Sequence, residues 1–263
     1  MPNTPREERS AVVVKVGGSV AGRADADATI VASLHDSGTP LVVVHGGGPL
    51  VGEWSTKLGL ESRFERGLRV TDEPTRDVAL ATLAGLANSR LVAALIQRGV
   101  PAVGLSGLDG GMLRAERESA ELGLVGRITL VDSSLLEELL ERGRVPVVAP
   151  AALEVGTGEP LNVNADSVAG ALAAAIGARL LVFVTDVPGV RGQDGKLIAS
   201  LDRERARALV DDGTIEGGML PKVEACLLAA SAGCRAAIVA SGGDALERLL
   251  AGDHVGTVVE AAA

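Results

Sequence analysis

The stretch AVVVKVGGS, from Ala11 to Ser19, joins a short β-branched run to two glycines and carries Lys15 inside its apolar part. An apolar run of this length that ends at glycine is typical of a fully buried strand. Burying a lysine is costly unless an anion meets it, and glycines let backbone N–H groups approach such an anion closely. The pattern therefore favours an anion site at the strand end about as much as it favours a lysine that reaches solvent beside an ordinary turn.

The same strand signature recurs along the chain, with helical patterns between several of the runs. The further runs are Leu41–Val44, Pro101–Leu105, Val145–Ala149, Leu180–Val184 and Ala236–Ala240. One helical pattern covers Asp132–Glu141, whose leucines fall on one stripe, and Asp132 is its candidate N-cap. Alternating strands and helices predict an α/β protein with a mostly parallel sheet that helices cover on both faces.

Two segments, Glu61–Val70 and Leu113–Val131, interrupt this alternation and have the pattern of hairpins, which commonly form lids or rims. Thr71 could cap the helix that follows the first hairpin. The Gly- and Pro-containing stretch Val155–Leu161 is the expected boundary between two lobes, and we place it between a strand and a helix.

Composition excludes several classes of protein. The 263 residues are 47% apolar and only 1% aromatic, with a net charge of −9, so the chain lacks the basic surface and stacking side chains of a nucleic-acid binder.

Cys226 and Cys234 have no partners that suggest a metal or disulfide framework. There is no Walker GxxxxGK[ST] motif and no complete dinucleotide-binding GxGxxG. No apolar signal core begins the sequence and no apolar run approaches the length of a membrane span, so we expect a cytoplasmic protein without a membrane partner.

Four further polar segments come next to predicted strands or helix starts. HGGGP, from His45 to Pro49, precedes a helix and suits an anion, with His45 as a structural residue of the loop rather than a base. LNVNADSVAG, from Leu161 to Gly170, offers an N-cap and an acidic first turn, or else a substrate loop. TDVPGVRG, from Thr185 to Gly192, is compatible with nucleotide contact. GGMLPKVEA, from Gly217 to Ala225, carries a lysine at a helix start that could equally be an exposed surface residue.

Seven motifs in register make the sequence resemble the acetylglutamate kinases of the amino acid kinase family, from about Val12 to Val259. These motifs are KVGGS, HGGGP, RGLRVTD, VGLSGLDGG, NVNADS, TDVPGV and GGMLPKVEA. The resemblance implies a three-layer αβα sandwich, the amino acid kinase fold. It implies an N-terminal lobe, residues 1–158, for the acetylamino acid and the dimer contact, and a C-terminal lobe, residues 159–263, for ATP.

The resemblance also implies roles for individual residues. Lys15 and Lys222 would flank the transferred phosphoryl group, and Asp166 would orient both lysines. The acetylamino acid would be bound by Gly46, Gly47, Arg69, Asn162 and Asn164. The phosphates and the nucleotide would be contacted by Gly17, Gly18, Asp186, Val187, Gly189, Val190, Arg191, Thr214, Ile215 and Glu216. No side chain is expected to bind a metal, because Mg²⁺ would be carried by ATP.

The implied reaction transfers phosphate from ATP to the γ-carboxylate of N-acetyl-L-glutamate, the second step of arginine (ornithine) biosynthesis. The acceptor is already deprotonated at pH 7, so no general base is needed, and the enzyme's task is positioning and charge stabilisation. Only about ten residues precede the first strand, and the arginine-inhibited hexameric members have an extra helix there, so we expect an arginine-insensitive homodimer.

Two alternatives stay open at the level of sequence. Leu108 stands where acetylglutamate kinases often have lysine, and leucine is common in the kinase of lysine biosynthesis whose aminoadipate or glutamate substrate is linked to a carrier protein. Arg63, Arg66 and Arg69 could meet such an acidic carrier. The second alternative is a homologue that senses amino acids without catalysis, against which the retention of both lysines speaks.

Overall fold

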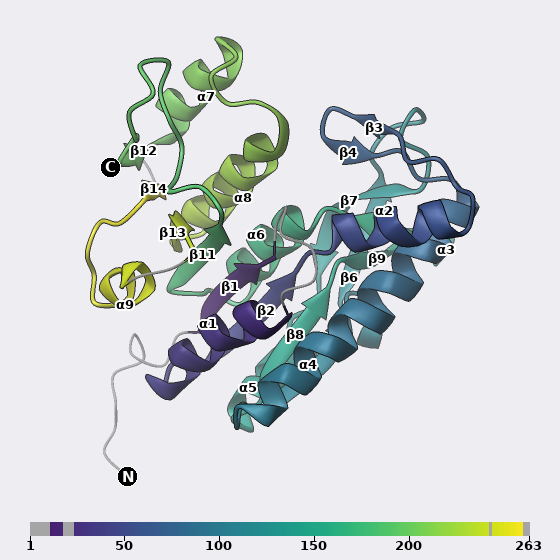
Figure 1. Cartoon of the computed structure of the whole chain (residues 1–263), viewed down its shortest axis with the longest axis horizontal. Helices are drawn as coiled ribbons and strands as arrows, with labels where there is room; N and C mark the ends of the chain where they lie inside the picture. The colour runs from purple at the N-terminus through teal and green to yellow at the C-terminus, as the bar shows by residue number, and fades with distance from the viewer. Residues whose placement is uncertain (1–10, 18–23, 242–243, 260–263) are drawn as a thin grey trace.

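The computed structural model describes residues 11–17, 24–241 and 244–259, and the chain folds around one eight-stranded sheet (Figure 1). Across the sheet the strands are β12 (Ser200–Leu201), β14 (Thr257–Val259), β13 (Arg235–Ala240), β11 (Leu180–Thr185), β1 (Val12–Val16), β2 (Leu41–His45), β8 (Val145–Ala149) and β5 (Ala102–Ser106). Every neighbouring pair is parallel except β13 with β14. All the strands that the β-branched runs predict are in this sheet, so the predicted α/β class is confirmed.

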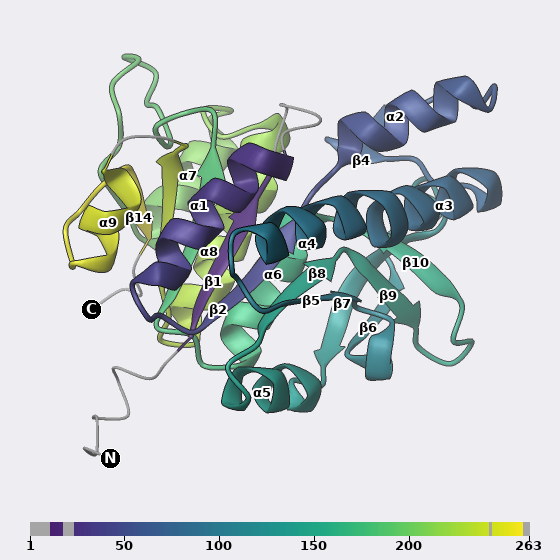
Figure 2. The same cartoon turned by 60° about the horizontal axis from the view of Figure 1, so that its bottom comes forward.

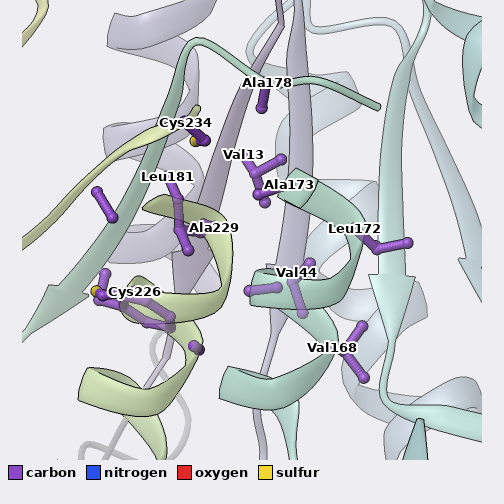
Figure 3. Close-up of a cluster of buried hydrophobic side chains, with 14 of the residues drawn as sticks. Val13, Val44, Val168, Leu172, Ala173, Ala178, Leu181, Cys226, Ala229 and Cys234 are labelled. Atoms are coloured by element: carbon purple, nitrogen blue, oxygen red, sulfur yellow. The ribbon is translucent and has the colours of Figure 1, made fainter. Parts of the chain in front are cut away.

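Helices cover both faces of the sheet. The α-helices are α1 (Ala24–Asp36), α2 (Gly48–Lys57), α3 (Glu73–Leu80), α4 (Asn88–Gln97), α5 (Ser134–Glu141), α6 (Ala165–Ala175), α7 (Arg203–Asp211), α8 (Leu220–Ser231) and α9 (Ala245–Leu250). Figure 2 shows α1 and α4 over one face of the sheet. The opposite face is covered by α6 and α8, as the close-up of the packed side chains shows (Figure 3). The predicted three-layer αβα sandwich is therefore confirmed.

Successive residues of β1 pack into different layers because side chains alternate across a strand. Val12, Val14 and Val16 join the buried cluster beneath α1 and α4, whereas Val13 joins the cluster beneath α6 and α8. Lys15 has the same parity as Val13, so its side chain leaves the strand toward α6 and α8. The alternation thus decides which helices the lysine can meet.

Both predicted hairpins are present, outside the main sheet. The first consists of β3 (Phe64–Glu65) and β4 (Leu68–Arg69), which pair antiparallel. The second consists of β6 (Leu113–Arg117) and β7 (Val125–Val131), which also pair antiparallel. The strands β6 and β7 join β9 (Ala151–Glu154) and β10 (Pro160–Val163) in a closed four-stranded barrel.

Three local predictions are wrong. The stretch Val155–Leu161 does not lie between a strand and a helix, because it contains the turn that connects β9 to its antiparallel partner β10. Thr71 does not cap α3. Its hydroxyl donates to the carbonyl of Arg69, and the side chain of Asp72 accepts from Thr75 N–H instead. The N-cap position of α5 is Ser133, one residue after Asp132.

A continuous helical stretch from Glu73 to Gln97, made of α3, a π-helical segment (Ala81–Ala87) and α4, corrects one further expectation. Its 25 residues are long and apolar enough to cross a membrane by length and composition alone, which the inspection of apolar runs missed. Core helices meet the same criterion. Here Leu91 and Leu95 of α4 are buried in the cluster with β1 and β2, as expected for a helix that covers a sheet.

The core is aliphatic apart from one ring, and this gives a prediction about stability. The chain has two phenylalanines, of which Phe183 is fully buried in β11 and Phe64 is 59% exposed. Phe183→Ala should lower the free energy of unfolding by about 3–5 kcal/mol, because it removes a large side chain from a packed interior. Phe64→Ala, the matched control, should cost far less. Denaturant titration of both variants measures the difference, and similar losses would contradict this description of the core.

Candidate active site

The side chain of Lys15, on β1, lies next to an acidic residue of the helix α6. Its Nζ lies 2.9 Å from Oδ1 of Asp166, in the first turn of α6, and donates to the carbonyl of Gly17 at 2.8 Å. The contact with Asp166 is an ion pair without hydrogen-bond geometry. Lys15 is 6% exposed and Asp166 is 5% exposed, so two charged groups are held together in the interior.

Lys222 approaches the same carboxylate from α8. Its Nζ donates to Oδ2 of Asp166 at 2.7 Å and to the carbonyl of Gly218 at 3.1 Å. Burial on its own would raise the pKa of Asp166, but the ammonium groups of Lys15 and Lys222 outweigh it and hold the pKa below its ordinary value. One ionised carboxylate between two ammonium groups leaves one positive charge in excess.

Lys15 and Lys222 both line a cavity of about 550 Å³, which lies beneath the β3–β4 hairpin. All eight of the predicted lysine, carboxylate and substrate residues line it together, and so does one of the predicted phosphate residues, Gly17. They are Lys15, Gly17, Gly46, Gly47, Arg69, Asn162, Asn164, Asp166 and Lys222. Among the described residues, the lining contains three cations and one carboxylate, so the cavity carries a surplus of positive charge and suits an anionic ligand.

The glycine segment after β2 adds backbone donors. Because β1 and β2 are in register with Val16 opposite His45, the segments that follow the two strands lie side by side. Gly46 N–H donates to the carbonyl of Val16 at 3.2 Å. Gly47 is the N-cap residue of α2, and α6 also begins at the cavity wall. Helix N-termini favour negative charge, so two of them add to the field of the cations.

Arg69 reaches the cavity from the hairpin and is 9% exposed. Its guanidinium donates to Ser62 Oγ at 2.6 Å and to the carbonyl of Gly48 at 3.0 Å, and it lies 4.7 Å from the centre of the Phe64 ring. Burial lowers the pKa of Arg69, yet guanidinium groups stay protonated in proteins. These contacts fix a cation at the end of the cavity that the hairpin covers.

The two asparagines of the predicted substrate loop differ in their contacts. Asn164 caps α6, because its Oδ1 accepts from the N–H groups of Asp166 and Ser167, as the sequence predicts. Asn162 lies on β10, and its Nδ2 donates to Thr71 Oγ1 at 3.2 Å. Both also line the cavity, so capping and ligand contact are compatible roles for Asn164.

The predicted nucleotide residues lie elsewhere. Gly18 is outside the described residues. Gly17 lines the cavity of the two lysines, but the other residues predicted to contact the phosphates or the nucleotide do not. These residues are Asp186, Val187, Gly189, Val190, Arg191, Thr214, Ile215 and Glu216. The side chains of Val190 and Ile215 are buried in the hydrophobic core, so only their backbone could meet a nucleotide.

Sequence reasoning missed the apolar wall of the cavity. It includes Val51, Phe64, Ala79, Leu83, Val125 and Pro150. These residues come from separate elements with no common motif, and nothing in their local pattern distinguishes them from ordinary core residues. Leu83 is an example. It lies in the π-helical segment and packs so close to Gly47 that a Cβ there would be 2.6 Å from its Cδ2.

Comparisons with known proteins show the family of the chain. The sequence profile of the amino acid kinase family matches residues 10–241. The chain belongs to the amino acid kinase family. Acetylglutamate kinase of Dehalococcoides mccartyi is 41% identical over 242 residues, covering 90% of this chain and 89% of the relative. Acetylglutamate kinase of Sinorhizobium medicae is 44% identical over 258 residues, covering 92% and 87%. The resemblance to acetylglutamate kinases that the motifs predict is confirmed.

Solved structures of this amino acid kinase fold are also similar. N-acetylglutamate synthase of Neisseria gonorrhoeae, solved with coenzyme A and L-arginine, aligns with a TM-score of 0.80 at 25% identity over 97% of this chain and 62% of that one. Carbamate kinase of Giardia lamblia aligns with a TM-score of 0.71 at 17% identity over 97% of this chain and 100% of that one, which supports the fold alone.

The shared carboxylate predicts an asymmetry in stability. Asp166→Asn should lower the free energy of unfolding at pH 7 by about 3–5 kcal/mol, because two buried ammonium groups lose their counter-ion. Lys222→Met, the control, should cost far less, since Lys15 and Asp166 remain a matched pair. Denaturant titration measures both, and equal losses would contradict the role of Asp166 as shared counter-ion.

The same residue sets a pH dependence. The folded-state pKa of Asp166 lies below its ordinary value of 3.8, so its contribution to stability is complete above pH 3.8 and is lost as pH falls through the folded-state pKa. The wild type and Asp166→Asn should therefore converge in stability in acid.

Proposed function

We propose that this protein is an acetylglutamate kinase, which transfers the γ-phosphoryl group of ATP to the γ-carboxylate of N-acetyl-L-glutamate in the second step of arginine biosynthesis. The observation that carries the proposal is the pair of ammonium groups held on one carboxylate, at 2.9 and 2.7 Å, at the wall of a cavity that also contains Arg69. The names of the relatives supply the substrate.

The difficulty of this reaction is the approach of two anions. Two like unit charges 4 Å apart repel by about 4 kcal/mol at an effective dielectric constant of 20. Lys15 and Lys222 flank the transferred phosphoryl group and stabilise the charge that spreads over its oxygens, while Asp166 holds both lysines in place. No proton has to be removed, because the attacking carboxylate is ionised at pH 7.

The acceptor lies in the cavity under the hairpin. Arg69 binds its α-carboxylate, Asn162 and Asn164 bind the acetylamino group, and the glycine segment of Gly46 and Gly47 receives the reacting carboxylate. Within that segment the N–H of Gly46 already donates to the carbonyl of Val16, so the N–H of Gly47 is the better placed donor. The apolar wall covers the carbon chain of the substrate.

ATP binds to the C-terminal lobe, residues 159–263, through the backbone and side chains of 186–191 and 214–216, and its phosphates reach Gly17 and Gly18. No side chain of this chain is assigned to magnesium; the ion would enter with ATP and would neutralise part of the phosphate charge. The described residues contain no group of three or more His, Cys, Asp or Glu side chains that could hold a metal. The N-terminal lobe, residues 1–158, supplies the dimer contact of a cytoplasmic homodimer.

The carrier-linked alternative is not favoured by the relatives, nor by the position of the residues that suggest it. Leu108 does not line the cavity. Arg69 is buried and lines the cavity, whereas Arg63 and Arg66 are exposed and do not line it.

The test of the function is an ATP-dependent assay in which hydroxylamine traps the acyl phosphate product. We expect activity with N-acetyl-L-glutamate and much less with glutamate, aspartate or acetylaminoadipate, because Arg69 and the asparagines match one chain length and the acetyl group. Activity that requires a carrier-linked substrate would support the lysine-pathway kinase. Tight ATP binding without turnover of any acceptor would support a sensor.

The two kinds of cation should have different kinetic signatures. Lys15→Ala and Lys222→Ala should lower kcat by about 100- to 1,000-fold, equivalent to roughly 2.7–4 kcal/mol, because each removes a donor to the transition state. Arg69→Ala should mainly raise KM for the acetylamino acid, since it removes ground-state binding. Lys57→Ala, at an exposed pair with Glu53, is the control. Steady-state kinetics decide; an unchanged kcat removes that lysine from the mechanism.

A further inference from the structure

His45 is a buried titratable group that the proposed chemistry does not use. It is 3% exposed at the end of β2, and it does not line the cavity. Its Nδ1 lies 2.9 Å from the carbonyl of Gly46, and its Nε2 lies 3.0 Å from Nδ2 of Asn88, the first residue of α4. The imidazole ring therefore connects a helix on one face of the sheet to the glycine segment of the cavity.

The partners of Asn88 determine the orientation of its amide. Its nitrogen lies 2.8 Å from the carbonyl of Val147 and 3.3 Å from the carbonyl of Leu105. Both partners are acceptors only, so the atom that faces them must be the NH₂ group, which cannot accept. The amide oxygen of Asn88 lies next to Gly104, because a Cβ on that glycine would collide with Oδ1. The amide cannot be reversed without placing its oxygen against these two carbonyl oxygens.

The amide in turn determines where His45 carries its proton. A donor at Asn88 requires Nε2 of His45 to accept, so the proton of the neutral ring is on Nδ1. Nδ1–H then donates to the carbonyl of Gly46. Burial lowers the pKa of His45, with Lys15 acting in the same direction, so the ring stays neutral at pH 7.

The last link is the peptide that joins Gly46 to Gly47. In a trans peptide the C=O and N–H groups point in opposite directions. Turning the Gly46 carbonyl toward His45 therefore turns the Gly47 N–H away from the ring, and Gly47 is one of the residues that line the cavity. Within the part of the chain that the structure describes, no group accepts from this N–H. Glycine at both positions would otherwise leave this peptide free to rotate.

We propose that Asn88 is a positioning residue for phosphoryl transfer, which fixes the His45 tautomer and thereby aims the Gly47 N–H at the reacting oxygen. Neither Asn88 nor His45 touches the substrate. A preorganised N–H donor contributes to catalysis because it needs no rearrangement as charge develops. The kinetic consequence rests on the function proposed above, whereas the tautomer does not.

The first experiment measures the tautomer in the wild-type protein without substrates. The chain has three histidines, His35, His45 and His254, so ¹⁵N spectra of the imidazole nitrogens can be assigned with single His→Gln variants of the other two. We expect His45 to show a protonated Nδ1 and an unprotonated Nε2 at pH 7. A protonated Nε2 would overturn the proposal, whatever the protein phosphorylates.

The second experiment uses Asn88→Leu, which keeps the size of the side chain and removes its donors. We expect kcat to fall about 10- to 100-fold, less than for deletion of a donor, because the N–H is misdirected rather than lost. KM for ATP should not change. The His45 signals should lose the single Nδ1–H pattern. A kcat within twofold of the wild type would overturn the proposal.

A matched control separates positioning from lost stability. Thr82 lies on the same long helix, is 4% exposed, and its hydroxyl donates to the carbonyls of Val78 and Ala79 and not to His45. Thr82→Val should lower the melting temperature as Asn88→Leu does and leave kcat and the tautomer unchanged. An equal loss of kcat in Thr82→Val would overturn the proposal. If Asn88→Leu does not fold, the wild-type tautomer still decides.

Discussion

The site depends on one carboxylate that holds two cations from distant parts of the chain. Asp166 pairs with Lys15 from the first strand and with Lys222 from the helix α8. Mutual repulsion would otherwise separate two ammonium groups in a poorly solvated interior. The carboxylate between them holds the lysines close together at the wall of the cavity. The arrangement of α6 and α8 on one face of the sheet is what brings the three groups together.

Much of the fold could be predicted because its signals are local. Short β-branched runs between helical patterns identify the central strands, and the hairpins were recognised from their patterns. Cap positions were less accessible. Thr71 has a neighbour that can cap equally well, and the tertiary environment selects between them: the hydroxyl of Thr71 donates to the hairpin, which leaves Asp72 for the helix.

The predictability of the site follows the same division. Lys15 and the glycine motifs could be recognised because a buried lysine beside glycines is an unusual pattern, and the meeting of Lys15 with Lys222 could be expected only through the family resemblance. The roles of the individual site residues remain predictions. The apolar wall could not be predicted, since Leu83 and Pro150 become neighbours only in the folded chain. Asn88 was missed for a similar reason: its partners His45, Leu105 and Val147 come from three strands.

The placement of Arg69 has an implication for how such a protein can change. The residue sits on a two-stranded ribbon outside the main sheet, whereas the lysines and their carboxylate belong to the central layers. In the proposed function, one part of acceptor recognition, the binding of the α-carboxylate by Arg69, is thus built on a structural module separate from the lysines that transfer phosphate. Replacing or remodelling the ribbon could redirect the scaffold to a different acid while the transfer machinery stays intact, which makes the ribbon the natural target for redesigning the specificity of the enzyme.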